Sequence, residues 1–526
     1  MPTLTPTGSQ TGPAAMAEDF CLISHLNPRD FWAGLKGGEA LVWMVALSLA
    51  LRLCLAAFMP FTADEAYAVV VSRSHSLSYF DHPPMMFVLA RFMADLTGSE
   101  SALLLRLPFV VMGTASLVFI YDITRRCFGA RAGFWAAAAF SVSPFFLSFG
   151  QLLIVPDGPL DLFLLVSFWA MLPILLEGEA KLFNWVLAGL ALALALMSKY
   201  QAVLFGVGAL LAMVSSVEGR RLLLQPGCWL AFGLASLGLL PILAWNASHE
   251  WISFAFQTGR AYQATGFGTH AVNFVSVLLG QAIYVLPGVW YIGQKAIWRG
   301  LSKPRVPIYR WLAILAVVPI VTFDIIGLFG HHTLPHWAMS GFLFALPLVG
   351  DVRARVEVSR RKYLNRVLLG ASLIIPAIAL LICLQSQTGI LTRFTYSEAP
   401  GFDIGWQNLE WTPKSGTLPR PDSFLVTEDW VQAGHAGLAF GPEHPIEILT
   451  EPHQFQFMDQ ARLKQLSQGY YVTAVPMSVQ VRDLTKIEAP LKGRFVPNGE
   501  PLVQTQFRMG FPSFHLVTIP VRRALP

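Results

Sequence analysis

The sequence predicts a mainly α-helical, polytopic membrane protein with a small α/β domain at its C-terminal end. Three observations support this class. The chain of 526 residues is 54% hydrophobic and only 13% charged, whereas charged residues make up about 25% of soluble proteins. Apolar runs long enough to cross a bilayer, about 20 residues each, follow one another from Leu41 onward. Beyond about residue 386 the composition becomes polar and no such run remains.

Charge and cysteine content argue against a nucleic-acid-binding protein and against a cysteine-based metal or redox site. The formal net charge is +5, but basic residues of membrane proteins gather in cytoplasmic loops, so we expect no nucleic acid partner. None of the five cysteines has a neighbour at the spacing of a metal knuckle or redox motif. Because none lies beyond Cys383, the C-terminal domain cannot contain a disulfide of its own.

Three regions are expected. Residues 1–38 are rich in Thr, Pro, Gly and Ala and lack the apolar segment of a signal peptide, so they predict a retained cytoplasmic tail. Residues 39–386 form the transmembrane domain. Residues 387–526 are long enough for a soluble domain of their own, which an odd number of spans places outside, in the periplasm.

The first span is expected over 41–59, with Arg52 facing the protein interior or reaching the interface. A polar stretch follows. The apolar segment 85–96, interrupted by Arg91 and Asp95, is too short to span and predicts a helix in the interface plane. Asp324 lies inside a later span and is a functional candidate without an assigned role.

The remaining spans bring the expected total to about eleven. Two pairs are so closely joined that we expect helical hairpins with tight outer turns. The predicted spans are 101–122, 132–150, 159–176, 182–197, 201–217, 228–247, 271–293, 311–330, 334–350 and 366–385.

Basic residues are distributed unequally between alternate loops, which orients the chain. One set of loops holds only Arg73, Arg91, Lys199 and Arg260. We therefore expect that set outside and the N-terminus in the cytoplasm. The basic residues of the other set are Arg125, Arg126, Arg131, Lys181, Arg220, Arg221, Lys295, Arg299, Lys303, Arg305, Arg310, Arg353, Arg355, Arg360, Arg361, Lys362 and Arg366.

The C-terminal region shows a mixed pattern of short elements. Strands are predicted over 425–427, 446–449 and 470–475, and a helix over 459–468.

Polar residues gather in the loops placed outside. Asp64, Glu65 and Asp81, with His82 and two prolines, follow the first span, and they form either a site or a solvated rim. Other outward residues carry alternatives of the same kind. Asp157 is a site residue or a helix N-cap, and Lys199 and Arg260 bind phosphate or anchor the interface. His331, His332 and His336 form a metal site, or else His331 and His332 lie in a solvated turn and His336 lines the acceptor pocket or belongs to an aromatic belt.

The ordered series of outer motifs resembles a known family. The series is Asp64-Glu65-Ala66-Tyr67, Tyr79-Phe80-Asp81-His82-Pro83-Pro84, Arg106-Leu107-Pro108, Pro156-Asp157-Gly158-Pro159, Ser198-Lys199-Tyr200, Trp245-Asn246 and His336-Trp337. Over residues 40–350 the chain resembles the bacterial branch of the protein mannosyltransferase and lipid A aminoarabinose transferase family, which are GT-C glycosyltransferases dependent on polyprenyl-phosphate sugars.

The resemblance implies roles for particular residues. Asp64 matches the catalytic carboxylate of the first outer loop, Asp157 the second acidic residue, and Lys199 a basic residue near the donor phosphate. Asp81-His82-Pro83-Pro84 occupies the place of a Glu-Lys-Pro-Pro motif in aminoarabinose transferases. Because His82 replaces that Lys, phosphate binding at this position requires a protonated His82.

The expected function is transfer of a sugar, with inversion, from a polyprenyl-phosphate carrier to a lipid, glycan or protein acceptor at the outer face of a bacterial inner membrane. A glycan ligase, a lipid-linked glycan transporter and a non-catalytic glycan-binding protein remain alternatives. A divalent metal is possible, with Asp81, His331 and His332 as candidate ligands. The expected catalytic residues are Asp64 and Asp157, and the expected substrate-binding residues are Glu65, Tyr67, Asp81, His82, Lys199, Tyr200, Arg260 and His336.

Overall fold

The computed structural model describes most of the chain after residue 38. Residues Leu47–Pro526 belong to one compact unit. The described residues are 39–178, 181–261, 267–329, 333–355, 358–388, 411–412, 419–420, 422–450, 454–477, 484–508 and 511–524.

Helices dominate the membrane part, as predicted. Within the described residues, five helical segments are long and apolar enough to cross a membrane, or seven if each of two bent helix pairs is one span. The total of eleven spans therefore stays a prediction. The five segments are Leu41–Phe58 in α3 (Glu39–Phe58), α6 (Ala102–Phe128), α9 (Asp157–Glu177), Pro226–Ala247 and α18 (Pro307–Phe329).

The other helices of this part are shorter or bent. They are α7 (Ala130–Val142), α8 (Pro144–Ser148), α10 (Leu182–Ser198), α11 (Ala202–Val214), α12 (Val217–Leu223), α13 (Pro226–Ser236), η1 (Leu237–Leu239), α14 (Leu240–Ala247), α15 (Ile252–Ala261), α16 (Phe267–Val285), α17 (Pro287–Ser302), η2 (Pro335–Ala338), α19 (Met339–Arg355) and α20 (Val358–Thr388).

The expected continuous span over 271–293 is wrong. The helix breaks after Val285, and α16 and α17 meet at 106°. Pro287 explains the break, because proline disfavours the helical conformation of the preceding residue and cannot donate a backbone hydrogen bond. Leu286, which separates the two helices, has φ 72°, a value that is uncommon for a residue other than glycine.

The polar stretch after the first span contains a helix that the sequence analysis did not predict, α4 (Ala63–Ser72). Thr62 and Glu65 form a capping box, in which each side chain accepts a hydrogen bond from the other residue's backbone N–H. The predicted interfacial segment is a separate helix, α5 (Met85–Thr97), on which Arg91 pairs with Asp95 at 2.7 Å.

Charged residues inside the spans face protein. Arg52 is fully buried and its Nε donates to the Ser48 carbonyl at 2.9 Å. Of the two predicted placements, it therefore faces the protein interior and does not reach the interface. Asp324 accepts a hydrogen bond from Gln281 Nε2 at 2.7 Å. This bond joins α16 to α18 and gives Asp324 a structural partner.

The C-terminal domain is built on a six-stranded mixed sheet. Its order is β2-β1-β3-β6-β4, with β5 also paired to β6. β1 (Phe424–Thr427), β2 (Ile446–Ile448) and β3 (Gln468–Pro476) confirm the predicted strands, and they pair in parallel. The unpredicted elements are α22 (Trp430–Phe440), η4 (Gln454–Phe457), α24 (Leu484–Glu488), η5 (Ala489–Leu491), β4 (Phe495–Pro497), β5 (Leu502–Arg508) and β6 (Phe511–Arg523).

The predicted helix over 459–468 is shorter than expected. It spans Gln460–Gln465 as α23, because β3 already begins at Gln468. The boundary near residue 387 between the two predicted domains stays a prediction, since residues 389–410 lie outside the described chain.

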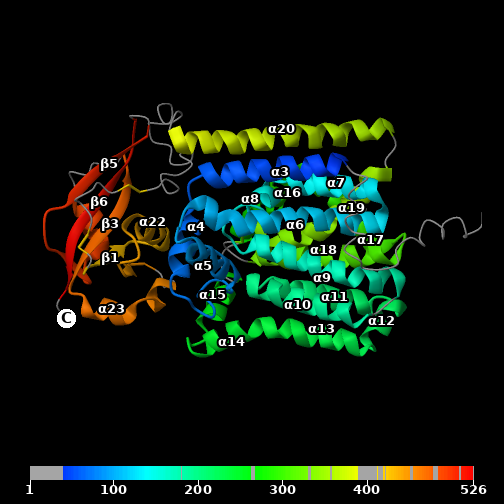
Figure 1. Ribbon diagram of the computed structural model, residues 1–526, viewed down its shortest axis with the longest axis horizontal. Coiled ribbons are helices and arrows are strands. Elements are labelled where there is room, and N and C mark those ends of the chain that lie inside the picture. The colour runs from blue at the N-terminus through cyan, green and yellow to red at the C-terminus, as the bar shows by residue number, and fades with distance from the viewer. Residues whose placement is uncertain are drawn as a thin grey trace, which may run out of the picture. The chain divides into compact units, whose positions relative to one another are not determined.

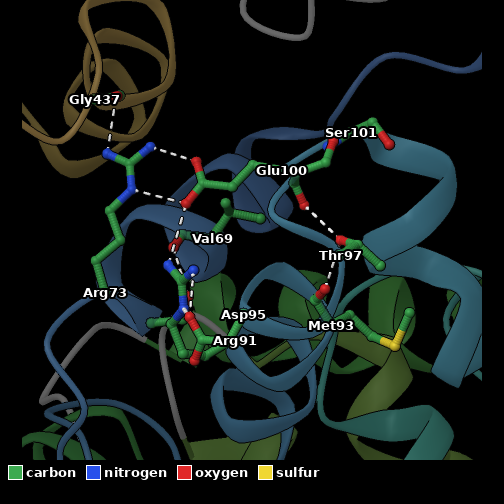
Figure 2. A network of polar contacts seen from close by, with 11 residues as sticks. Val69, Arg73, Arg91, Met93, Asp95, Thr97, Glu100, Ser101 and Gly437 are labelled. Carbon is green, nitrogen blue, oxygen red and sulfur yellow. Dashed lines mark hydrogen bonds and ion pairs between the residues drawn. The ribbon is translucent and has the colours of Figure 1, made fainter.

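Helix α22 packs between the strands and α4, as Figure 1 shows. Gly434 and Gly437 let the helices approach closely: a Cβ at Gly434 would lie 2.6 Å from Tyr67 N. Arg73, the C-cap residue of α4, strengthens the contact, because it donates to the Gly437 carbonyl at 3.0 Å while pairing with Glu100 at 2.6 Å (Figure 2). The C-terminal domain is thus docked on the helix that carries Asp64.

We expect Gly434→Ala to lower the melting temperature of the protein. The added methyl group would meet backbone atoms of Ala66 and Tyr67, which cannot rotate away, and overpacking of this kind costs about 1–3 kcal/mol. Gly233→Ala on α13 is the matched control, because nothing lies within 4 Å of its added methyl group. Equal melting temperatures for the two variants in a thermal unfolding assay would show that α22 does not pack tightly on α4.

Candidate active site

One cavity of about 570 Å³ brings together residues from distant parts of the chain. Its wall is formed by residues near α4, α5, α9, α10, α15 and η2 and by the start of α22. Seven predicted site residues line it: Asp64, Tyr67, Asp81, His82, Asp157, Lys199 and His336.

Asp64 is the second residue of α4 and its side chain is open to the cavity. Surrounding protein raises the pKa of this carboxyl to about 6, and the negative charges of Asp81, Glu65 and Asp157 act in the same direction, while Lys199 opposes them. A carboxylate with such a pKa is a better proton acceptor than an ordinary Asp and is still ionised at neutral pH.

Asp157 and Lys199 form an ion pair in the same cavity. Lys199 Nζ donates to Asp157 Oδ1 at 2.7 Å, and both side chains are nearly buried. The N-cap of α9 is Pro156 and makes no side-chain cap, so the alternative of Asp157 as an N-cap is wrong. Lys199 follows the last residue of α10 and lines the cavity. Because its side chain is nearly buried there, it does not act as an anchor at the membrane interface.

Asp81 is held by three neighbours. Tyr67 donates its hydroxyl to Asp81 Oδ1 at 2.8 Å, and Gln257 Nε2 donates to the Asp81 carbonyl at 2.6 Å. His82 Nε2 lies 3.7 Å from Asp81 Oδ2. Burial and the neighbouring Asp81 keep the pKa of Tyr67 well above its usual value, so its phenol is a hydrogen-bond donor here.

Aromatic rings also line the cavity. The His336 ring is stacked on Phe149, with centroids 5.5 Å apart and planes at 13°. Trp430, the first residue of α22, stands at 5.5 Å from Tyr67 in an edge-to-face contact. Three aromatic lining residues were not predicted from the sequence, in which only their aromatic character was a signal: Phe149, Phe256 and Trp430. Trp337, which also lines the cavity, belongs to the predicted motif His336-Trp337.

Glu65, predicted to bind substrate, lies outside the cavity. Its side chain and that of Arg106 are both fully buried, and the two form a bidentate ion pair with both distances 2.7 Å. Thr62 N and Ile154 N also donate to its carboxylate. Burial raises the pKa of Glu65, but Arg106 and these donors outweigh it, so the pKa lies below the usual value.

Tyr200, another predicted residue, is not among the described residues that line the cavity. Tyr200 packs beside Phe254, with ring centroids 5.9 Å apart, and burial raises its pKa to about 12. Arg260 is in α15, but its side chain lies outside the described residues, as do His331 and His332.

No group of three or more His, Cys, Asp or Glu residues within the described chain could hold a metal ion. Asp81 and His82 are two adjacent donors in the cavity, which is fewer than a protein metal site normally supplies. Since His331 and His332 are not described, a metal site that includes them stays a prediction.

The chain is similar to known proteins in sequence. Residues 81–245 match the family model described as dolichyl-phosphate-mannose-protein mannosyltransferase. The lipid A galacturonosyltransferase RgtD of Rhizobium johnstonii is 24% identical over 268 residues, which are 50% of this chain and 55% of that protein. The match thus spans about half the length of this curated relative.

The chain is also similar to a solved structure in fold. ArnT from Cupriavidus metallidurans bound to undecaprenyl phosphate matches with a TM-score of 0.56 and 15% identity, over 91% of this chain and 98% of that chain. The apo structure matches with a TM-score of 0.55 and 14% identity, over 92% and 98%. The chain therefore has the fold of ArnT, and over residues 81–245 it is similar in sequence to the mannosyltransferase family model.

Proposed function

We propose that this protein is an integral membrane glycosyltransferase that moves a sugar from a polyprenyl-phosphate carrier to a lipid, glycan or protein acceptor. The cavity that joins Asp64 to the Asp157–Lys199 pair carries this proposal, because it offers a proton acceptor and a phosphate-binding cation in one space. The relatives agree with it: one is a lipid A galacturonosyltransferase and another binds undecaprenyl phosphate.

The reaction is a single displacement. The acceptor hydroxyl oxygen forms a bond to the anomeric carbon while the bond from that carbon to the carrier phosphate breaks. The phosphate keeps the electron pair, and Asp64 accepts the hydroxyl proton. One displacement inverts the anomeric configuration, and the phosphate leaves as a stable anion without needing an acid.

Lys199 is the cation that binds the phosphate in this proposal. A primary ammonium offers charge-assisted hydrogen bonds to phosphate oxygens. Asp157 positions Lys199 through their 2.7 Å contact and keeps the nearly buried ammonium neutralised before the donor arrives. A protonated His82 on the same cavity wall would add a second positive group near the phosphate.

The sugar would lie in this cavity, in contact with its acidic and aromatic side chains. Ligand cavities of about 300–1,000 Å³ are typical for small molecules, and the volume of about 570 Å³ falls in this range. Trp430 brings the C-terminal domain into the cavity wall, which supports a role of this domain in acceptor choice.

The proposed location is the bacterial inner membrane, with the cavity facing the periplasm. Its lining residues Leu334, His336 and Trp337 follow the C-terminal end of α18, in a loop of the set that is poor in basic residues. Basic residues mark the cytoplasmic side of membrane proteins. This distribution supports the assignment of the cavity to the outer face.

Transfer from a panel of radiolabelled polyprenyl-phosphate sugars to a membrane lipid extract, measured across pH, tests this function. We expect transfer from one donor, with kcat/KM rising about tenfold per pH unit below about pH 6 and then levelling off, because Asp64 must be ionised.

Absence of transfer from every donor would contradict the function. A profile of kcat/KM that levels off near pH 4, the pKa of an ordinary Asp, would be compatible with the proposed function. It would show that the pKa of Asp64 is not raised in the active enzyme.

A further inference from the structure

A second cavity, of about 390 Å³, lies where α17 ends, α18 begins and α19 ends. It shares no residue with the candidate active site and nothing in the proposed reaction uses it. Its polar lining residues are Arg299, Lys303, Arg305, Tyr309, Asp351 and Arg355.

The cavity carries an excess of positive charge. Arg355 Nε pairs with Asp351 Oδ1 at 2.6 Å, which accounts for the single carboxylate of the lining. Among the described residues no carboxylate forms an ion pair with Arg299, Lys303 or Arg305, and all three are exposed. Bringing three like charges to one concave surface is unfavourable unless an anion joins them.

This cavity and the candidate active site lie at opposite ends of α18. Tyr309 is near the first residue of that helix, whereas His336 follows its last residue. The 23 residues of α18 span about 35 Å at about 1.5 Å per residue, roughly the apolar thickness of a bilayer. If the active site faces the periplasm, the basic cavity is at the cytoplasmic surface.

Apolar side chains beside the cavity are exposed. Trp298, adjacent to Arg299, is 71% exposed, and Val306, adjacent to Arg305, is 40% exposed. Trp residues are enriched at the level of lipid headgroups. The cavity therefore combines cations for a phosphate with apolar surface for the chains attached to it.

We propose that this cavity binds the phosphate headgroup of an anionic phospholipid from the cytoplasmic leaflet. Basic pockets between membrane helices on that side are suited to such headgroups. A free phosphate would use the same cations but would gain nothing from Trp298 and Val306. The inference depends on the membrane orientation and does not depend on the transferase activity.

The test is lipid binding to the full-length protein, stripped of lipid in an uncharged detergent and followed by native mass spectrometry. Phosphatidylglycerol, phosphatidylcholine and inorganic phosphate are titrated separately. We expect one phosphatidylglycerol to bind at least about ten times more tightly than phosphatidylcholine. The triple variant Arg299→Gln/Lys303→Gln/Arg305→Gln should bind it about 100-fold more weakly, from about fivefold for each charge removed.

The matched control is Arg131→Gln/Arg220→Gln/Arg221→Gln, which removes three exposed charges from other loops of the same set. It should bind phosphatidylglycerol as the unmodified protein does. Equal loss in both triples, equal binding of the two lipids, or displacement by inorganic phosphate at matched concentration would overturn the proposal. If the cavity triple fails to fold, Arg305→Gln alone should weaken binding about fivefold.

Discussion

Replacing Asp64 by Asn should lower the rate of sugar transfer by about 100- to 10,000-fold, because the acceptor hydroxyl loses the group that takes its proton. Asn has nearly the same shape and fits the same place on α4. Donor binding should persist, since Lys199 and Asp157 are unchanged. The measurement compares kcat and the donor dissociation constant of the purified variant with those of the unmodified protein.

The same substitution should have the opposite effect on stability. The folded protein raises the pKa of Asp64 from 3.8 to about 6, so the neutral form is favoured by folding. This contribution is complete below about pH 4 and is lost as pH rises through about 6. Asp64→Asn should therefore raise the melting temperature at pH 8 and leave it nearly unchanged at pH 4.

These two readouts separate a catalytic carboxylate from a structural one. A structural carboxylate would lose activity and stability together when it is replaced. Equal transfer rates for the variant and the unmodified protein would remove Asp64 from its assigned role. Asp157→Asn is the useful comparison, because Lys199 would lose its partner and donor binding should weaken along with turnover.

The membrane architecture could be predicted because hydropathy depends on local sequence. Apolar length located the long helices. The orientation of the loops, which depends on the unequal distribution of basic residues, stays a prediction. The helix break at Leu286 also has a local sequence signal, Pro287. The sequence analysis did not use this signal, because the apolar run continues through it. Prolines inside α6, α9 and α18 do not end those helices, so a proline alone does not decide the outcome.

The contribution of the C-terminal domain could not be predicted. Trp430 reaches the cavity only because α22 docks on α4, and this contact joins residues more than 350 positions apart. The glycines of α22 also lower its intrinsic helix propensity. Gly434 and Gly437 are explained by the close approach to α4, which is a property of the folded protein.

Glu65 was assigned to the site because it is adjacent to Asp64 in sequence. In a helix, consecutive side chains point about 100° apart. Once α4 begins at Ala63, the two carboxylates must face different surroundings: Asp64 faces the cavity and Glu65 faces Arg106. The sequence Thr62-Ala63-Asp64-Glu65 matches the pattern of a capping box. This signal could have predicted where α4 begins, and with it the structural role of Glu65 and the site role of Asp64.

Breaking the buried pair should therefore destabilise the protein strongly. Arg106→Leu would leave the Glu65 carboxylate buried without its partner, a change that typically costs about 3–5 kcal/mol. Arg106 also donates to the carbonyls of Met59 and Pro60 at 2.6 and 2.8 Å, which anchors the turn between α3 and α4. The measurement is thermal or denaturant unfolding of the purified variant in detergent.

The double variant Glu65→Leu/Arg106→Leu decides between a structural and a substrate-binding Glu65. Replacing both charges by apolar groups avoids an unpaired buried charge, so much of the lost stability should return, although the carbonyls that Arg106 bound remain unsatisfied. If Glu65 only holds α4 in place, transfer activity should return with stability and the KM for the donor should stay close to its original value. A double variant that is stable but inactive would place Glu65 in the reaction itself.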